Sequence, residues 1–493
     1  MPMIHILPTD IFQEVSEGTS VMEALRSVGI LLDAPCGGNG KCGKCTVIIN
    51  GTEALACQTR IEDDTQILIP EEKDLHVMRA GIETEGRVDP LCPGMLLAID
   101  IGTTSVVCFL LDGANGREIA SSSALNPQIA YGADVITRIR EALAGKLEAQ
   151  RDVIRQKLTE LIQEVCRQAE IEPAQIGLVS VVGNPAMQQL FLGISPQNLV
   201  TIPFGPVLNE AETVSCRDIL PICENAQLLI VPDISGYVGA DTMGCVLSTR
   251  LYDADELTLM VDIGTNGEMV LGNKERMIAC STAAGPALEG ANILFGMRGT
   301  DGAIDHVKNE DGEFSCSVIG GGKAEGICGS GLIDAVAASL DAGMINKRGR
   351  IISTEEIDGQ RFISLCDGVY LNQEDIRQVQ MAKGAICAGV QLMAKQLGKE
   401  VLDIKHVLLA GAFGSFMDPD SACRIGLLPE ELQGRIVAVG NAAGSGAKLM
   451  ARDKAEISRS QKLKEKIEFL ELASLKEFSG TFARAMNFRE AQK

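Results

Sequence analysis

The sequence predicts a multidomain protein of the α+β and α/β classes, in which a small β-rich N-terminal unit precedes a linker and a larger α/β body. The segment 256–271, ELTLMVDIGTNGEMVL, has two apolar runs separated by a polar, glycine-rich turn, and a similar phrase, LLAIDIGTTSVV, occurs at 96–107. Ahead of both, residues 1–78 combine short apolar runs with a loop rich in cysteine and glycine. With 493 residues the chain is long enough for two to four domains.

Composition excludes several classes of protein. The net charge of −22 disfavours nucleic acid or an anionic membrane as a partner. No stretch reaches the roughly 18 apolar residues of a membrane span, and the start, MPMIHILPTD, does not resemble a signal peptide. We therefore expect a cytoplasmic protein in a reducing compartment. Of its 16 cysteines, the clustered ones are expected to bind metal, and the other twelve to be small buried side chains.

Residues 1–78 are predicted to form the first domain. Ser20 and Glu23 have the spacing of a capping box, so we expect a helix over 20–29. Strands are expected in four apolar runs, at 3–8, 45–51, 53–57 and 65–70.

Four cysteines of this domain predict an iron–sulfur site. Cys36, Cys42 and Cys45 have the spacing C-x5-C-x2-C, and Cys57 follows after eleven residues. Thiolates must converge on a cluster from several directions, and the glycines of the loop permit the backbone conformations that this needs. Structural zinc is the alternative, but it usually shows two well-separated CxxC or CxxH pairs. A [2Fe–2S] cluster is therefore favoured.

A linker is expected at 79–95, because this stretch is charged, contains Pro90 and Pro93 and shows no sustained periodicity. The α/β body then divides into a first lobe at 96–255 and a second lobe at 256–493, each beginning with one copy of the repeated phrase.

The first lobe begins with a strand pair around the turn Asp100–Thr104, and a long helix is expected over 133–169. Gly183 and Asn184 end a later strand just before a predicted helix, and such helix N-termini bind anions readily. Strand–turn–helix units are expected at 176–194 and 228–249.

The second lobe repeats this plan. Its hairpin at Asp262–Asn266 is followed by a strand and a small-residue turn at 277–293. Glycines at 320–331 precede an amphipathic helix, and Gly411 and Gly414 directly follow an apolar strand, where small residues would let a flat ring approach the backbone. The C-terminal stretch, 464–488, is expected to add a strand and a helix.

The two repeated turns suit phosphate and Mg²⁺. Our hypothesis is that Asp100 and Asp262 hold Mg²⁺ or its waters, while threonine hydroxyls and turn N–H groups bind phosphate oxygens. The alternative is that each aspartate only caps its own turn. Glu268 lies by alternation on the same face as Asp262 and could orient water, but an exposed strand residue is the favoured interpretation. The isolated histidines, His5, His76, His306 and His406, are expected to be structural.

The N-terminal domain resembles the ferredoxin-like family, which has the β-grasp fold. The short gap to Cys57 and the phrase LACQT resemble the ferredoxin domains of succinate dehydrogenase iron–sulfur subunits and of corrinoid activators.

The order of motifs over about 96–450 resembles the acetate kinase, sugar kinase, Hsp70 and actin superfamily. In that superfamily, two ribonuclease-H-like lobes clamp ATP between them, and nucleotide binding or hydrolysis opens and closes the cleft. The nucleotide-binding residues that this implies are Asp100, Gly102, Thr103, Thr104, Gly183 and Asn184 in the first lobe, and Asp262, Gly264, Thr265, Asn266, Gly329, Ser330, Gly331, Gly411, Ala412, Phe413 and Gly414 in the second.

Within this superfamily the chain most resembles the reductive activators of corrinoid proteins, which join a [2Fe–2S] domain to such an ATPase. The phrases that carry the resemblance are NPQIAYGADVITRI (126–139), GNPAMQQLFLG (183–193), DIGTNGEMVLG (262–272), AAGPALEGANI (283–293), GICGSGLIDA (326–335) and LAGAFGSFMDP (409–419).

The resemblance implies an ATP-hydrolysing activase that reduces the Co(II) of a corrinoid protein of a methyltransferase system to Co(I). It implies ATP, Mg²⁺ and a [2Fe–2S] cluster as cofactors, an upstream electron donor and a homodimer. The corrinoid is expected on the partner, because the DxHxxG phrase of corrinoid carriers is missing. Three alternatives stay open: an activator of another low-potential enzyme, such as a 2-hydroxyacyl-CoA dehydratase, a small-molecule kinase with a regulatory cluster, and a redox-sensing partner protein without ATP turnover.

Overall fold

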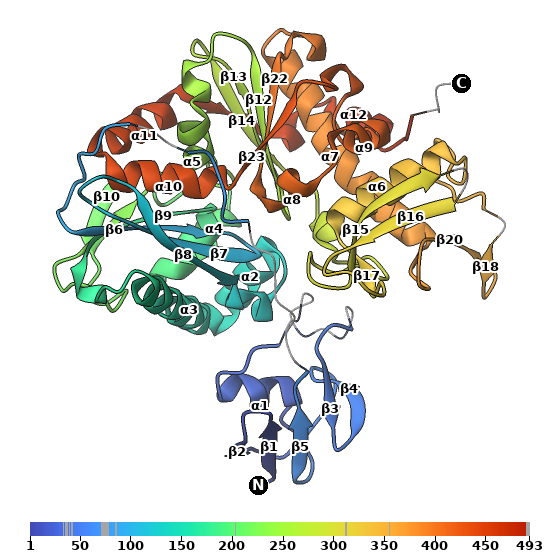
Figure 1. The fold of residues 1–493 in the computed structure, drawn as a ribbon, viewed down its shortest axis with the longest axis horizontal. Coiled ribbons are helices and arrows are strands. Elements are labelled where there is room, and N and C mark those ends of the chain that lie inside the picture. The colour runs from blue at the N-terminus through green and yellow to red at the C-terminus, as the bar shows by residue number, and fades with distance from the viewer. Residues whose placement is uncertain are drawn as a thin grey trace.

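The computed structural model describes residues 1–32, 34, 38, 40, 43–70, 78–83, 86–202, 204–310, 313–353 and 355–489. Three bodies are visible: a small N-terminal domain, and above it two α/β lobes that lie side by side (Figure 1). Among these described residues, no helix has both the length and the apolar character that crossing a membrane requires.

The N-terminal domain is a five-stranded sheet in the order β2-β1-β5-β3-β4, with one helix packed on it. The expected capping box is present, since the Ser20 hydroxyl accepts from the Glu23 N–H and the Glu23 carboxylate accepts from the Ser20 N–H. Strand β2 was not expected from the sequence. The elements are β1 (Met3–Leu7), β2 (Ile11–Glu14), α1 (Val21–Ser27), β3 (Thr46–Ile49), β4 (Thr52–Leu55) and β5 (Thr65–Leu68).

The first lobe has a six-stranded sheet in the order β10-β11-β9-β6-β7-β8. Strands β6, β7 and β8 are antiparallel, while β9 pairs parallel with β6 and β11 pairs parallel with β9. The elements are β6 (Met95–Ile101), β7 (Ser105–Leu111), β8 (Glu118–Leu125), α2 (Val135–Glu141), α3 (Leu147–Gln168), β9 (Ile176–Gly183), α4 (Pro185–Leu192), β10 (Glu212–Ser215), β11 (Gln227–Ile230) and α5 (Ala240–Thr249).

One prediction for this lobe was wrong. The expected continuous helix over 133–169 is divided into α2 and α3, because Gly145 adopts a φ of 96°, outside the helical region. Glycine takes this conformation without a steric penalty. The helical periodicity of the sequence therefore continues across a position where the helix itself is interrupted.

The second lobe repeats the sheet, with the order β23-β22-β12-β13-β14-β24. As in the first lobe, three antiparallel strands continue into two parallel ones. The main elements are β12 (Thr258–Ile263), β13 (Gly267–Gly272), β14 (Met277–Thr282), α6 (Gly329–Asp341), α7 (Gln373–Gln396), β22 (His406–Ala410), α8 (Gly411–Phe416), α9 (Pro419–Ile425), β23 (Ile436–Gly440), α10 (Ala442–Arg452), α11 (Lys454–Lys466), β24 (Ile467–Phe469) and α12 (Phe478–Ala485).

Smaller sheets extend the second lobe away from the first (Figure 1). A disulfide joins Cys316 to Cys366 there, across a sequence separation of 50. The expectation of small free cysteines was wrong for this pair, because only the folded chain brings the two positions together. The strands are β15 (Ala303–Glu310), β16 (Glu313–Val318), β17 (Gly326–Ile327), β18 (Glu356–Ile357), β19 (Gln360–Arg361), β20 (Ile363–Ser364) and β21 (Tyr370–Leu371).

Helices α5 and α10 join the two lobes. They cross so closely that a Cβ atom on Gly446 would lie 2.2 Å from the Gly244 Cα. The Ser248 hydroxyl of α5 donates to the Ala442 carbonyl at the start of α10 (2.8 Å). One apolar core around these helices takes residues from both sheets, such as Leu96 and Met260. The two repeated turns, Asp100–Thr104 and Asp262–Asn266, therefore belong to lobes that share one apolar core.

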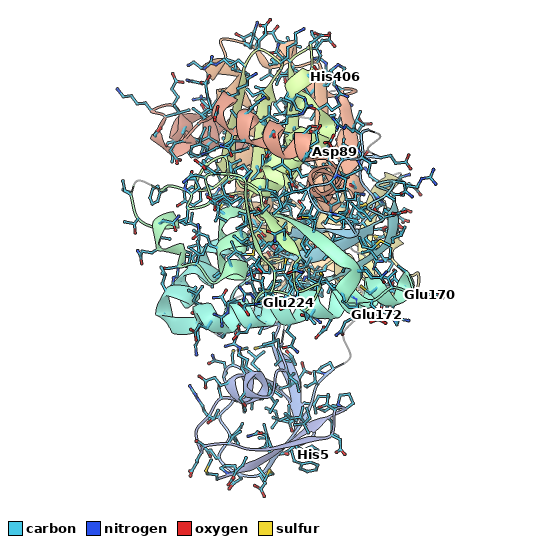
Figure 2. The ribbon with its side chains drawn as sticks, turned by 90° about the vertical axis from the view of Figure 1, so that its left-hand side faces the viewer. His5, Asp89, Glu170, Glu172, Glu224 and His406 are labelled. Carbon is cyan, nitrogen blue, oxygen red and sulfur yellow. A yellow bond between two sulfur atoms is a disulfide. The ribbon has the colours of Figure 1, made fainter. Side chains whose placement is uncertain are left out.

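The described part of the linker is bound to both lobes rather than extended through solvent. Arg79 donates to Ser123 Oγ of β8 (2.9 Å), and the Ala80 carbonyl accepts from the N–H of Asn441 (2.9 Å). Further along, Asp89, labelled in Figure 2, donates its N–H to the Arg452 carbonyl (2.9 Å). The chain thus passes along α10 before it enters β6.

Each described histidine contacts the side chain of a nearby residue. His5 stacks on Phe12, His306 pairs with an aspartate, and His406 lies 2.9 Å from a Glu256 carboxylate oxygen. Figure 2 shows His5 and His406 at opposite ends of the molecule. The expectation that they are structural is met for these three, while His76 lies outside the described residues.

Candidate functional site

The turn of the first lobe, Asp100–Thr104, is held in place by a buried arginine. The Arg138 side chain is fully buried, and its guanidinium donates to the Thr103 carbonyl (2.6 Å) and to the Gly132 carbonyl (2.8 Å). Asn126 donates to the Gly102 carbonyl (2.8 Å). With its carbonyls bound on this side, the turn directs the Thr103 and Thr104 hydroxyls toward the cavity between the lobes.

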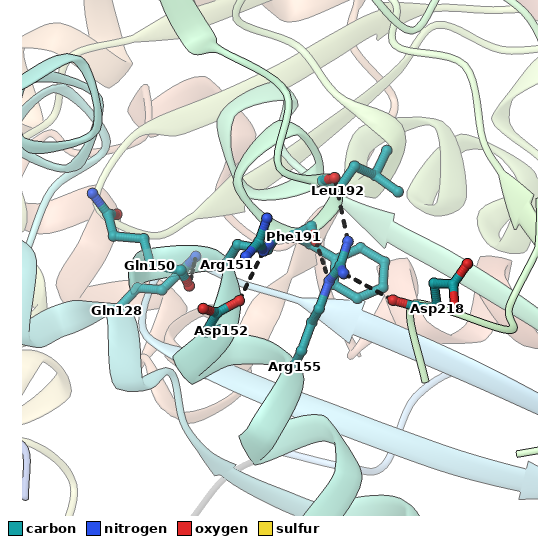
Figure 3. A network of polar contacts seen from close by, with 8 residues as sticks. All are labelled: Gln128, Gln150, Arg151, Asp152, Arg155, Phe191, Leu192 and Asp218. Carbon is teal, nitrogen blue, oxygen red and sulfur yellow. Dashed lines mark hydrogen bonds and ion pairs between the residues drawn. The ribbon is translucent and has the colours of Figure 1, made fainter. Parts of the chain in front are cut away.

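Helix α4 places a second polar group beside this turn. Asn184 caps the helix by accepting from the Met187 N–H (3.0 Å), and its amide donates to Thr103 Oγ1 (3.0 Å). The other end of α4 is held by Arg155 of α3, which donates to the Phe191 and Leu192 carbonyls (Figure 3). Both ends of α4 are therefore fixed relative to the turn.

The second-lobe turn is a tight hairpin between β12 and β13, as predicted, with Ile263 opposite Gly267. Its Gly264 N–H donates to the Asn266 carbonyl (2.9 Å), and the Thr265 side chain is buried. The Thr265 hydroxyl donates to a carboxylate oxygen of Glu289 (2.8 Å).

The two turns line one cavity of about 500 Å³, which has the size of a small-molecule site. It lies between the lobes and takes residues from both. The predicted site residues that line it are Asp100, Gly102, Thr103, Thr104, Asn184, Asp262, Gly264, Thr265, Asn266, Gly329, Ser330, Gly411 and Phe413.

Three predicted residues do not line this cavity. A Cβ atom on Gly183 would lie 2.8 Å from the Ile101 carbonyl oxygen, and one on Gly331 would lie 2.3 Å from the Ile304 carbonyl oxygen. Gly414 packs against Leu409 in the same way. These glycines permit close packing of the backbone instead of contacting a ligand. The side chain of Ala412 lies outside the described residues.

The cavity has a polar end and an apolar end. At the apolar end, Phe413 and Phe416 of α8 line the cavity. Phe413 packs directly on Gly329, where a Cβ atom would meet the Leu288 carbonyl at 1.8 Å and the Phe413 ring at 2.7 Å. Aromatic side chains in a cavity wall suit contact with a planar ring system.

Carboxylates gather at the polar end. Burial, with a smaller contribution from the nearby Asp241 carboxylate, raises the pKa of Asp100 to about 7 and the pKa of Asp262 to about 7. Burial also raises the pKa of Asp241 itself, to about 6. For Asp100 this is partly offset by the Asn441 amide, which donates to its Oδ2 (2.9 Å). A bound cation would stabilise the ionised form of these buried carboxylates.

Glu268 belongs to this group, so the favoured expectation of an exposed strand residue was wrong. It lies directly opposite Asp262 in the β12–β13 register and lines the cavity. Burial and the charges of Asp241 and Asp262 raise its pKa well above the usual value. Within the part of the chain that the structure describes, no three His, Cys, Asp or Glu side chains already form a metal site. Phosphate oxygens would have to complete the coordination of a cation here.

Sequence reasoning missed several residues of this cavity, among them Asp241, Glu289 and Asn441. The signal for Asn441 is a second internal repeat, because VGNPA at 182–186 and VGNAA at 439–443 have the same order of residues. In both copies the asparagine caps a helix and its amide donates to a nucleotide turn. Glu289 carried no such signal.

The cysteine loop of the N-terminal domain is only partly described. Cys45 is buried at the start of β3 and Cys57 is half-buried, whereas Cys36 and Cys42 lie outside the described residues. Gly38, Gly40 and Gly43 have φ values of 92°, 71° and 66°, which side chains rarely adopt. A loop with this many left-handed glycines fits the demand that thiolates converge on a cluster.

Comparison with protein families matches most of the chain in three parts. Residues 4–66 match a 2Fe-2S iron-sulfur cluster binding domain, residues 95–254 match the RACo middle region, and residues 256–493 match the C-terminal domain of RACo, described as the ASKHA domain.

Relatives agree with this division. The chain is 32% identical to the corrinoid activation enzyme RamQ of Eubacterium limosum, over 95% of this chain and 96% of that protein. It is 24% identical to the [Co(II) methylated amine-specific corrinoid protein] reductase of Methanosarcina barkeri, over 80% and 76% of the two chains. Among solved structures, it is similar to a reductive activator for corrinoid, iron-sulfur protein, with a TM-score of 0.74 and 28% identity, covering 100% of this chain and 99% of that one.

Proposed function

Because this chain belongs to the family of corrinoid activation enzymes, we propose that it is an ATP-dependent reductive activase that reduces the Co(II) of a corrinoid protein of a methyltransferase system to Co(I). The observation that carries this is the pairing of two parts: a cavity walled by a nucleotide turn from each lobe, and a [2Fe–2S] domain on the same chain. Neither part alone would distinguish an activase from a kinase or from a ferredoxin.

The residues of the cavity have separate roles in this proposal. Asp100 and Asp262 would hold Mg²⁺ or its waters, and Thr103, Thr104 and Thr265 would donate to phosphate oxygens together with the turn N–H groups. The base would lie beside Gly411 and Phe413, which line the cavity. Hydrolysis then depends mainly on positioning and on electrostatic stabilisation of the phosphoryl group.

The N-terminal domain supplies the redox part. Cys36, Cys42, Cys45 and Cys57 would hold the [2Fe–2S] cluster, which supplies one electron at low potential when bound. Clusters of this type lie near −400 mV. An acceptor roughly 100–200 mV lower opposes the transfer by about 2–5 kcal/mol. ATP can offset this if it distinguishes two conformations by a comparable free energy.

The remaining assignments belong to the same proposal. We assign 1–78 to the ferredoxin-like domain, 79–95 to the linker, and 96–255 and 256–493 to the two ATPase lobes. The corrinoid is carried by the partner protein, an upstream donor reduces the cluster, and the protein acts as a homodimer in the cytoplasm.

An anaerobic assay tests the function. Chemically reduced protein is mixed with a Co(II) corrinoid protein, with and without MgATP, and the absorption of Co(I) is followed. We expect Co(I) to form in a MgATP-dependent manner. A small-molecule kinase would transfer phosphate to a metabolite without reductant, and a dehydratase activator would leave every corrinoid partner as Co(II). Either outcome would contradict the proposal.

A further inference from the structure

A single carboxylate joins the two nucleotide turns inside the cavity. Glu289 ends a short 3-10 turn, Pro286–Glu289, in the second lobe. Its Oε1 accepts from Thr104 Oγ1 of the first lobe (2.9 Å), and its Oε2 accepts from Thr265 Oγ1 of the second lobe (2.8 Å). The side chain therefore links the lobes at the position where their threonine hydroxyls meet.

These contacts compete with nucleotide phosphate. Each threonine hydroxyl has one proton to donate, so Thr104 and Thr265 cannot donate to Glu289 and to a phosphate oxygen at once. A carboxylate and a phosphate at the same place also repel each other. Phosphate that accepts from both hydroxyls must displace Glu289 from both of them.

The ferredoxin-like domain contacts both lobes at the surface of the protein. Arg26 of α1 donates to the Ala130 carbonyl of the first lobe, and its guanidinium lies 5.3 Å from the centre of the Tyr131 ring. Lys44, which lies between Cys42 and Cys45, donates to the Gly296 carbonyl of the second lobe (2.8 Å). One contact on each lobe means that a change in the angle between the lobes strains or breaks one of them.

Glu289 and Gly296 belong to one rigid segment. A Cβ atom on Gly296 would lie 2.0 Å from the Gly290 carbonyl oxygen, so the two ends of the loop touch through their backbones. The Met297 N–H also donates to the Ile327 carbonyl (2.9 Å). The inner contact with Thr104 and the outer contact with Lys44 are thus carried by the same piece of the second lobe.

We propose that Glu289 is a nucleotide-displaced latch: it holds the lobes in one arrangement until the phosphates of ATP take over Thr104 and Thr265, and its release frees the ferredoxin-like domain from Arg26 and Lys44 anchorage so that a partner protein can reach the cysteine loop. This rests on the proposed function, and it assigns a positioning role to Glu289 and Lys44. The domain stays tethered, because Ala80 is bound to Asn441 at the edge of the cavity.

The test measures access to the ferredoxin-like domain without any corrinoid. The holoprotein is reduced anaerobically, and its rate of electron transfer to cytochrome c, a protein-sized acceptor, is recorded with and without the non-hydrolysed analogue MgAMP-PNP. We expect the analogue to raise the wild-type rate at least threefold. Glu289→Gln should already show the raised rate without nucleotide, and should bind ATP about threefold to tenfold more tightly.

Lys44→Met is the second variant. It removes the outer contact without touching the cavity, so it should show the raised nucleotide-free rate with unchanged ATP affinity. Glu256→Gln is the matched control, because Glu256 is an exposed second-lobe glutamate that pairs with His406. It should behave as wild type. The visible spectrum of the cluster confirms that each variant is loaded.

The outcomes separate the latch from the proposed function. If MgAMP-PNP does not change the wild-type rate of cytochrome c reduction, while MgATP still drives Co(II) reduction in the parallel assay, the latch alone is overturned. The same holds if Glu289→Gln responds to the analogue as wild type does, or if it loses hydrolysis without a change in cytochrome c reduction, which would identify a water-orienting base. Loss of ATP-dependent Co(II) reduction in the wild type would instead overturn the function.

Discussion

The two lobes have the same sheet, but they equip their nucleotide turns differently. In each, a strand ends at an aspartate and a hairpin follows, with a parallel strand alongside. The group that each aspartate faces differs. The Asp241 carboxylate lies near both aspartates. Asp100 also receives a hydrogen bond from the Asn441 amide, whereas Asp262 has Glu268 opposite it in register. An amide donor orients a carboxylate, whereas added carboxylates attract a cation.

The lobes also use their buried cations differently. In the first lobe, Arg138 holds the nucleotide turn itself through the Thr103 carbonyl. In the second lobe, the buried Lys383 of α7 is bound to the Ala485 and Asn487 carbonyls of the C-terminal segment, away from the turn. The second turn is supported by Glu289 instead, which a ligand can displace. The first turn is therefore fixed, and the second is the adjustable one.

The largest expected effect tests the difference between the aspartates. We propose that the more acidic side, around Asp262, holds Mg²⁺, so Asp262→Asn should lower ATP-dependent Co(II) reduction at least about 100-fold and Asp100→Asn only about tenfold. Rates are measured in the anaerobic Co(I) assay, and Mg²⁺ dependence is compared between the variants. Both should keep the cluster spectrum of the wild type. A larger loss in Asp100→Asn would place the metal on the first lobe.

A smaller effect is expected from the cation of the fixed turn. Lysine cannot reproduce both hydrogen bonds of the Arg138 guanidinium, so Arg138→Lys should weaken ATP binding about tenfold. Isothermal titration with ATP measures this. Arg140→Lys is the control, because Arg140 lies on the same helix but is exposed. Equal ATP affinity in both variants would show that Arg138 does not support the turn.

Much of this comparison could be predicted from the sequence, because it depends on local patterns. The repeated DIGT phrase, the Ser20–Glu23 spacing and the change from strand to helix at Gly183 and Asn184 each act within a few residues, and the structure shows each of them. The break at Gly145 lies inside a continuous charge pattern, so periodicity could not show it.

The contacts that make the lobes unequal join distant parts of the chain. Thr104 and Glu289 are 185 residues apart, and Asp100 and Asn441 are 341 apart. No spacing rule connects such pairs, because the crossing of α5 and α10 decides which helix end faces which turn. The raised pKa of Glu268 depends on a distant residue in the same way, because the carboxylate of Asp241, from the first lobe, contributes to it.

The smallest expected effect concerns Lys383, the second lobe's cation. Burial lowers its pKa from 10.5 to about 8, so between these values the unfolded chain binds more protons than the folded one. The stability of the wild type, measured against Lys383→Met, should therefore rise with pH through this window, by about 2 kcal/mol between pH 7.5 and 9.5. Urea unfolding at several pH values measures this difference, in which the titration of the buried cysteines cancels, apart from that of Cys387, because the Cys387 thiol interacts with Lys383. Lys395→Met on the same helix is the control, because Lys395 is exposed and pairs with Glu477. A flat difference for Lys383→Met would mean that the ammonium of Lys383 is solvated in the folded chain.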